Sequence, residues 1–147
     1  MRQRNIFKRL SMLLLMAVMA TATALAQGDL KTGKAFEQYG HAKGCKMVEL
    51  HDTRLKGYKL KVYKSLTYKK YGENIATLLK EDRKRAKKIR EVVENGRIVS
   101  GYYMMPAEEK NINRYILFSN TDSNRGAVIY IEGKLSPQDI MSICYSK

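Results

Sequence analysis

The chain has 147 residues, 28 Lys plus Arg, 14 Asp plus Glu and a formal net charge of +14. This length fits one domain, since single domains typically hold roughly 100–200 residues. A hydrophobic content of 44% argues against wholesale disorder. Two Cys exclude a disulfide-dense mini-protein and a four-Cys zinc site. The composition therefore predicts a single basic globular domain.

The first 26 residues have the order of a secretory signal peptide. Four cations between Arg2 and Arg9 precede an uncharged apolar run, Leu10 to Leu25, and Ala24-Leu25-Ala26 is a small-x-small cleavage signal. The alternative is an uncleaved anchor helix, for which the run is short, because a span needs about 20 residues. Cleavage would leave residues 27–147 as a soluble domain in the periplasm or outside the cell. Its net charge would fall from +14 to +10, because four cations and no acidic residue leave.

Export decides how Cys45 and Cys144 are interpreted. In an oxidising compartment these two residues can form one intramolecular disulfide. Such a bridge would close a loop of about 100 residues and stabilise the fold by roughly 4–5 kcal/mol in the chain-entropy model. The alternative is two separate buried thiols that behave as small hydrophobic side chains. The sequence leaves both interpretations open, because it does not give the distance between the two Cα atoms.

The first predicted elements of the mature chain are a helix and a hairpin. Asp29 is a suitable N-cap for a helix over about 30–41. An apolar-rich strand is predicted at 45–50 and an alternating strand at 58–66. Because residues 52–57 have turn chemistry, the two strands predict a β-hairpin.

The strongest helical pattern covers about Glu73 to Glu94. Its apolar residues recur at spacings of three and four, and Asn95-Gly96 follows as a stop signal. These apolar positions are Ile75, Leu78, Leu79, Ala86, Ile89, Val92 and Val93. The opposite side would carry Lys80, Lys84, Lys87 and Lys88. The pattern predicts one helix of roughly 20 residues, long enough to cover a sheet.

Three further strands and a last helix complete the predicted order. Strands are expected at 97–105, 112–119 and 126–132, joined by short polar connections that favour an antiparallel meander. Ser136-Pro137 predicts a helix start, with Ser as N-cap and Pro at the first helical position. We therefore expect an α+β fold: an antiparallel sheet of about five strands packed on one face against a long helix, with shorter N- and C-terminal helices.

The sequence offers little catalytic chemistry. His51 and Asp52 are neighbours, and a carboxylate can orient an imidazole base, although adjacent residues in a turn are more often polar surface. Metal binding needs three or four clustered ligands, which two His and two distant Cys do not supply. No phosphate-loop, nucleophile-elbow or dinucleotide motif is present. We therefore expect no enzymatic activity and no cofactor.

Two basic features point instead to an anionic partner. Lys80 to Arg90 contains seven cations and two anions, and Tyr58 to Tyr71 interleaves four Tyr with five Lys. Such surfaces suit polyanions, including acidic sugars. The alternatives are a solvated helix face, partly balanced by i,i+4 pairs, and a strand with Tyr in the core and Lys at its edge. The candidate polyanion-binding residues are Lys59, Lys61, Lys80, Lys84, Lys87 and Lys88.

Three stretches of the chain resemble a known group of proteins. Residues 63–71 (YKSLTYKKY), 82–103 (DRKRAKKIREVVENGRIVSGYY) and 130–135 (YIEGKL) resemble small exported proteins of Bacteroidota-type bacteria, which are grouped as domains of unknown function. The resemblance implies a short α+β domain behind a signal peptide. It implies no catalytic residue.

The sequence thus predicts an exported, non-enzymatic domain that binds an anionic component of the cell envelope. Export disfavours nucleic acid as a partner, and no membrane span is expected after signal cleavage. One alternative is a structural or protein-interaction domain whose sheet faces a partner; another is a small hydrolase using His51 and Asp52. The polyanion hypothesis expects the cations of the long helix to meet Tyr58 to Tyr71 on one concave surface. Their placement on opposite sides would remove its main support.

Overall fold

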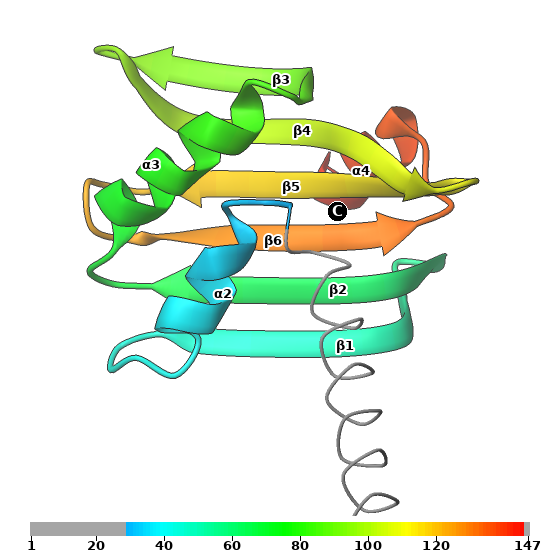
Figure 1. The fold of residues 1–147 in the computed structure, drawn as a ribbon, viewed down its shortest axis with the longest axis horizontal. Helices are drawn as coiled ribbons and strands as arrows, with labels where there is room; N and C mark the ends of the chain where they lie inside the picture. Colours follow the sequence, from blue (N-terminus) through cyan, green and yellow to red (C-terminus); the bar gives the residue numbers. More distant parts are fainter. Residues whose placement is uncertain (1–28, 146–147) are drawn as a thin grey trace, which may run out of the picture. The chain divides into compact units, whose positions relative to one another are not determined.

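The computed structural model describes residues 29–145, and the fold below is that of residues 31–145. The predicted signal peptide, residues 1–26, lies outside the described residues. Six strands form one antiparallel sheet in the order β1-β2-β6-β5-β4-β3, and three helices pack on it (Figure 1). The elements in chain order are α2 (Gly33–Tyr39), β1 (Lys46–Leu55), β2 (Tyr58–Tyr68), α3 (Gly72–Arg83), β3 (Lys87–Glu94), β4 (Arg97–Glu109), β5 (Ile112–Asn120), β6 (Gly126–Gly133) and α4 (Pro137–Tyr145).

The predicted fold class, five strands packed against a long helix, is wrong. The helix that we expected over 73–94 ends at Arg83, and Lys87–Glu94 is strand β3, paired antiparallel with β4. Asn95 and Gly96 both have positive φ, 51° and 74°, as a two-residue type I′ hairpin turn requires. The dipeptide that we interpreted as a helix stop therefore reverses a strand.

Several local predictions are confirmed. β1 and β2 form the expected hairpin, closed by the pair Leu55 and Tyr58. β4, β5 and β6 follow one another as the expected antiparallel meander. Helix α4 starts as predicted: the Asp139 amide donates to Ser136 Oγ at 3.1 Å, and the Ser136 amide donates to Asp139 Oδ2 at 2.8 Å. This reciprocal pair is a capping box, in which Asp takes the place usual for Glu.

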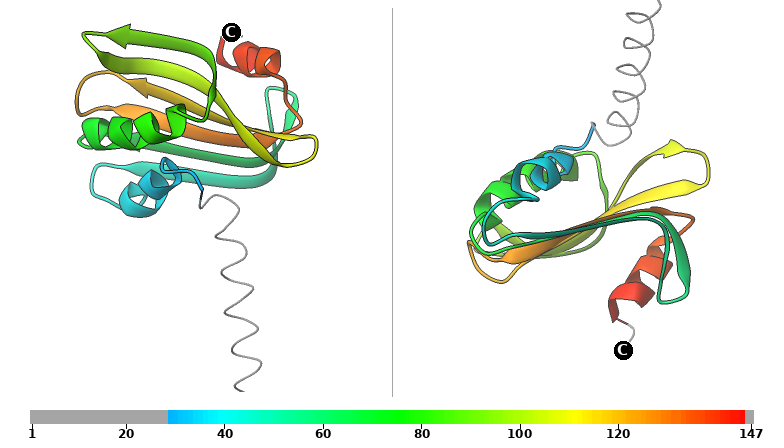
Figure 2. Two further views of the ribbon diagram at one scale, coloured as in Figure 1. Left: turned by 45° about the horizontal axis from the view of Figure 1, so that its top comes forward. Right: turned by 90° about the horizontal axis from the view of Figure 1, so that it is seen from below.

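The helices cover both faces of the sheet, whereas we expected them on one face. Helices α2 and α3 lie on one side and α4 on the other (Figure 2). Leu60, Leu117 and Ile131 pack with Ile140 and Ile143 of α4. Because side chains alternate along a strand, the buried neighbours in β5 and β6 face α2 and α3 instead. These neighbours are Ile116, Phe118, Val128 and Tyr130. The sheet therefore has two separate cores.

A buried carboxylate ties the two helices of one face together. Asp82, in the last turn of α3, is 1% exposed and accepts hydrogen bonds from the amides of Lys31 and Thr32 at 2.8 and 2.7 Å. Amides before the first turn of a helix lack partners within it, and negative charge is favourable there. Asp82 therefore caps α2 from another element. Within residues 29–145 no helix is long and apolar enough to cross a membrane.

Candidate functional site

The predicted polyanion-binding lysines lie in two separate places. Lys59 and Lys61 are on β2, whereas Lys80, Lys84, Lys87 and Lys88 lie on α3, its C-cap and β3. Three strands separate β2 from β3 in the sheet, and four steps of about 4.8 Å place them ~19 Å apart. In β3, Lys87 is paired with Met104 and Lys88 with Tyr103, so the two side chains point to opposite faces. The six lysines therefore do not form one concave surface.

Intramolecular ion pairs engage many cations of the α3–β3 connection. Arg83 donates to Glu91 from Nε and Nη2, both at 2.6 Å, and Lys88 Nζ lies 3.4 Å from the same carboxylate. Hydrogen bonds from Arg83 hold the pKa of Glu91 at about 2, although its burial acts in the opposite direction. Lys84 pairs with Glu81 at 3.3 Å. This basic segment is thus partly neutralised by the fold itself.

Most of the interleaved Tyr/Lys run is also structural. Tyr58 and Tyr63 pack against the α4 side of the core, while Tyr68 is buried on the opposite face. Lys61 Nζ donates to Glu109 at 2.7 Å. Along β2 the run therefore follows the alternative of Tyr toward the core and Lys at the surface. Its last residues, 69–71, lie beyond β2 and do not follow this strand pattern.

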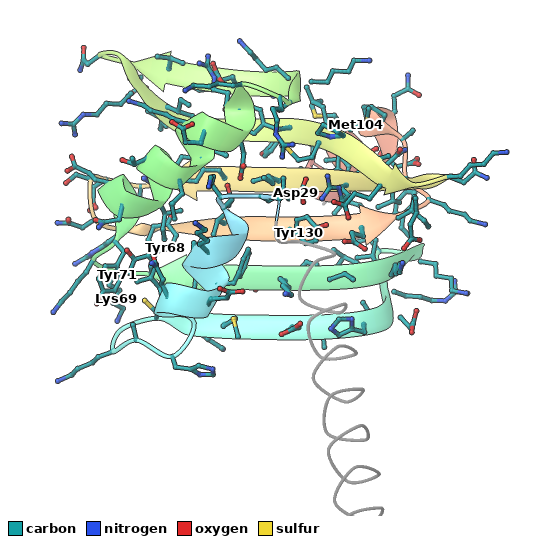
Figure 3. All side chains as sticks on the ribbon, viewed as in Figure 1. Asp29, Tyr68, Lys69, Tyr71, Met104 and Tyr130 are labelled. Carbon is teal, nitrogen blue, oxygen red and sulfur yellow. The ribbon has the colours of Figure 1, made fainter. Side chains whose placement is uncertain are left out.

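The end of the run meets the loop between α2 and β1. The rings of Tyr39 and Tyr71 stack with centroids 4.3 Å apart and planes at 20°. A Cβ on Gly44 would lie 3.9 Å from Lys69 Cβ, so this loop touches the chain that leaves β2. Figure 3 labels Lys69 and Tyr71 at the end of β2, next to α2. We define the Tyr–Lys corner as Tyr39, Lys43, Lys69, Lys70 and Tyr71.

The lysines of the Tyr–Lys corner are exposed and uncompensated. None of the three makes an ion pair with another residue of the described chain, in contrast to Arg83, Lys84 and Lys88. The two stacked Tyr side chains are half-buried, so part of each ring stays accessible. Clustered cations raise the local concentration of anions. Chemically, the corner offers three ammonium groups on the segments beside an aromatic surface.

A cavity of about 650 Å³ lies beside α3, between this helix, the β3–β4 turn and the β5–β6 loop. Most of the residues that line it are polar or charged, and Arg97 Nη1 on one wall lies 3.1 Å from Glu73 Oε1 on another. The sequence reasoning missed this cavity. The sequence predicted its three segments as a helix, the stop signal of that helix and one turn, and no local pattern shows that they enclose a space.

Comparison with known proteins gives a family without an assigned function. Residues 19–144 match the model of a family of unknown function, DUF6108. The chain belongs to this family. The match confirms the resemblance to a domain of unknown function. No curated protein and no solved structure matches the chain. Since the family has no assigned function, the function of this member has to be argued from its own geometry.

The structure does not bring Cys45 and Cys144 together as a disulfide. Both are free thiols: Cys45 directly precedes β1, and Cys144 lies in α4 against the core. Burial raises the pKa of each thiol, which keeps both in the unreactive protonated form at neutral pH.

The proposed hydrolase pair does not form a cleft. His51 lies on edge strand β1 with its side chain 59% exposed, and its Nε2 is 3.1 Å from Glu49 Oε1. Hydrogen bonding from His51 lowers the pKa of Glu49. Neither His51 nor Asp52 lines the 650 Å³ cavity. In the described part of the chain, no group of three His, Cys, Asp or Glu residues is placed to hold a metal ion.

Proposed function

We propose that this protein is an exported, non-enzymatic domain that binds an anionic polymer of the cell envelope at the Tyr–Lys corner. One observation carries the proposal: three exposed lysines without ion-pair partners in the described chain lie on the two segments that meet beside a stacked Tyr pair. Export rests on the signal sequence alone. The site differs from the six lysines expected from the sequence, which the fold divides between two ends of the sheet.

An acidic polysaccharide fits this corner best among anionic polymers. Its repeated negative charges match three lysines, and its sugar rings can lie against the exposed parts of Tyr39 and Tyr71. Binding should weaken with salt, because each neutralised charge releases a counterion. In protein–nucleic acid binding, each neutralised phosphate contributes about 0.7–0.9 to the slope of log K, the binding constant, against log salt concentration. We use the same value for each neutralised charge of the polysaccharide. Three lysine contacts therefore give an expected slope of about −2 to −3.

The test is titration of the purified exported protein with alginate, a carboxylated polysaccharide, and with neutral dextran as the uncharged comparison. A triple variant, Lys43→Glu, Lys69→Glu and Lys70→Glu, should lower the affinity for alginate about tenfold or more, or ~1.4 kcal/mol. Dextran should not bind. Tyr71→Leu should lower the affinity without changing the salt slope, because it removes ring contact and no charge.

Two matched triple variants decide where the ligand binds. Lys59→Glu, Lys110→Glu and Lys134→Glu change the net charge equally on exposed residues outside the corner, and we expect a reduction below about threefold. Lys84→Glu, Lys87→Glu and Lys88→Glu reverse the α3–β3 connection. A loss confined to the α3–β3 variant would move the site there. Equal losses in all three would leave only non-specific charge attraction, and no alginate binding at low salt would end the proposal.

A protein-interaction role is the second candidate, favoured by exposed apolar side chains on both edge strands. Leu50 of β1 is 45% exposed and Val93 of β3 is 50% exposed. Edge strands present unpaired backbone groups that a partner strand can use. Co-purification of one stoichiometric protein that high salt does not release, and that Leu50→Lys does release, would favour this role over polyanion binding.

A further inference from the structure

The cavity beside α3 has a well-fixed frame. Asp122 accepts hydrogen bonds from the amides of Asn124 and Arg125 at 2.8 and 2.7 Å, which fixes the β5–β6 loop on itself. Asn120 accepts from the Tyr68 hydroxyl and donates to the Gly72 carbonyl at 3.0 Å, which joins this loop to the start of α3. A site formed before its ligand arrives loses little conformational entropy on binding.

The β3–β4 turn and helix α3 form the rest of the cavity wall. The β3–β4 turn is a tight type I′ turn, and one helical face of α3 opposes it with Glu73, Ala76, Thr77 and Lys80. The volume of about 650 Å³ lies within the ~300–1,000 Å³ usual for small-molecule sites. The floor is apolar, formed by Ile98 and Val99.

Four charged side chains of this cavity fall into one matched and one unmatched pair. Glu73 and Arg97 neutralise each other at 3.1 Å. Lys80 and Glu94 both line the cavity, yet neither makes an ion pair with the other or with any further described residue. Ion pairs are closer than about 4 Å, so Lys80 and Glu94 leave a wider gap between two opposite charges.

We propose that this cavity binds a small zwitterion, a free amino acid or a short peptide. The ligand carboxylate pairs with Lys80, and its ammonium group pairs with Glu94. Hydroxyl and amide groups of Thr77, Asn95 and Thr121 are available to the peptide groups between these charges. This site is independent of the Tyr–Lys corner and of the polymer proposed there.

Other ligand classes fit the cavity less well. A polyanion meets three carboxylates, Glu73, Glu94 and Asp122, against two cations, so it is repelled. A neutral sugar leaves Lys80 and Glu94 without partners, and the lining has no aromatic ring for a sugar face. A zwitterion is the class that satisfies both charges at once.

The test uses tri-alanine as the probe, with NMR of the isotope-labelled protein as readout. Titration to about 10 mM covers the weak affinity expected for a ligand with few heavy atoms. Tri-alanine should shift the amide signals of the β3–β4 turn and the β5–β6 loop. The same peptide with an acetylated N-terminus and an amidated C-terminus should bind at least about tenfold more weakly, since it carries neither charge.

Charge exchange provides the matched variants. Lys80→Glu and Glu94→Lys should each reduce tri-alanine affinity about tenfold, and the double exchange should restore it, because the ligand can reverse its direction. Lys110→Glu and Glu37→Lys, on exposed residues that do not line the cavity, should leave the affinity unchanged. Equal binding of free and blocked peptide, or no shift around the cavity at the highest concentration, would overturn the proposal. So would a double exchange that binds no better than the single variants.

Discussion

Replacing Glu91 with Gln should destabilise the fold at neutral pH and have little effect near pH 2. Glu91 of β3 accepts two hydrogen bonds from Arg83 at the end of α3, and one from the Tyr103 hydroxyl at 2.6 Å. A glutamine keeps an oxygen for Tyr103 but loses the charge that faces Arg83. In one continuous helix, residues 83 and 91 would be about 12 Å apart along the axis and would not touch.

The magnitude follows from the pKa of Glu91. Its ordinary value of 4.5 falls to about 2 in the folded protein, chiefly through the hydrogen bonds from Arg83. Each pKa unit is worth about 1.4 kcal/mol, so the whole difference corresponds to ~3 kcal/mol. Arg83 is 40% exposed, and solvent screening reduces the value. We expect Glu91→Gln to cost about 2 kcal/mol at pH 7.

The sign of the pH dependence is fixed by the direction of the pKa change. Because the folded pKa of Glu91 is depressed, its stabilisation is complete above about pH 4.5 and is lost as the pH falls through about 2. Urea unfolding followed by far-UV circular dichroism measures this, since the chain has no Trp. The wild-type and Glu91→Gln curves should converge between pH 4.5 and 2. Glu94→Gln, the same change on the same strand at an exposed residue, should cost under ~0.5 kcal/mol. Equal costs for both variants, or a Glu91→Gln cost that is the same at pH 7 and pH 2, would refute the reasoning.

Three further predictions concern single residues. Asp82→Ala should cost about 2–4 kcal/mol in urea unfolding, because it leaves the buried amides of Lys31 and Thr32 without an acceptor; a cost under ~1 kcal/mol would mean that α2 is held by other contacts. Thr32→Val should raise the free energy of unfolding by about 0.5–1 kcal/mol, because Thr32 Oγ1 is buried with no hydrogen-bond partner among the described residues. A lower thermal midpoint for that variant would show that the hydroxyl does have a partner. Gly96→Ala should cost about 1 kcal/mol through its φ of +74° alone, because nothing lies within 4 Å of the added Cβ; an unchanged midpoint would contradict the type I′ turn.

The sequence predicted an element correctly where its local pattern fits only one kind of secondary structure. The capping sequence at Ser136 predicts a helix start and the alternating run from Tyr58 predicts a strand, and both elements begin where expected. A bulge between Leu60 and Val62 interrupts the alternation itself. Residues 87–94 have two interpretations. Ile89, Val92 and Val93 continue a helical spacing, yet they are β-branched, and Asn-Gly both ends helices and turns hairpins. Pairing with β4 and the contact of Glu91 with Arg83 decide for a strand, and these are tertiary facts.

The sequence by itself determined the basic character, the signal-like N-terminus and the presence of Tyr and Lys together up to Tyr71. Only the tertiary structure decided which charges are compensated and which segments share a surface. It separated Lys59 from Lys87 by the width of three strands, and it brought Tyr39 against Tyr71 from 32 positions away. The physical reason is that charge and periodicity are local properties of the chain. Strand pairing and helix docking bring distant residues together, and no local signal specifies those contacts.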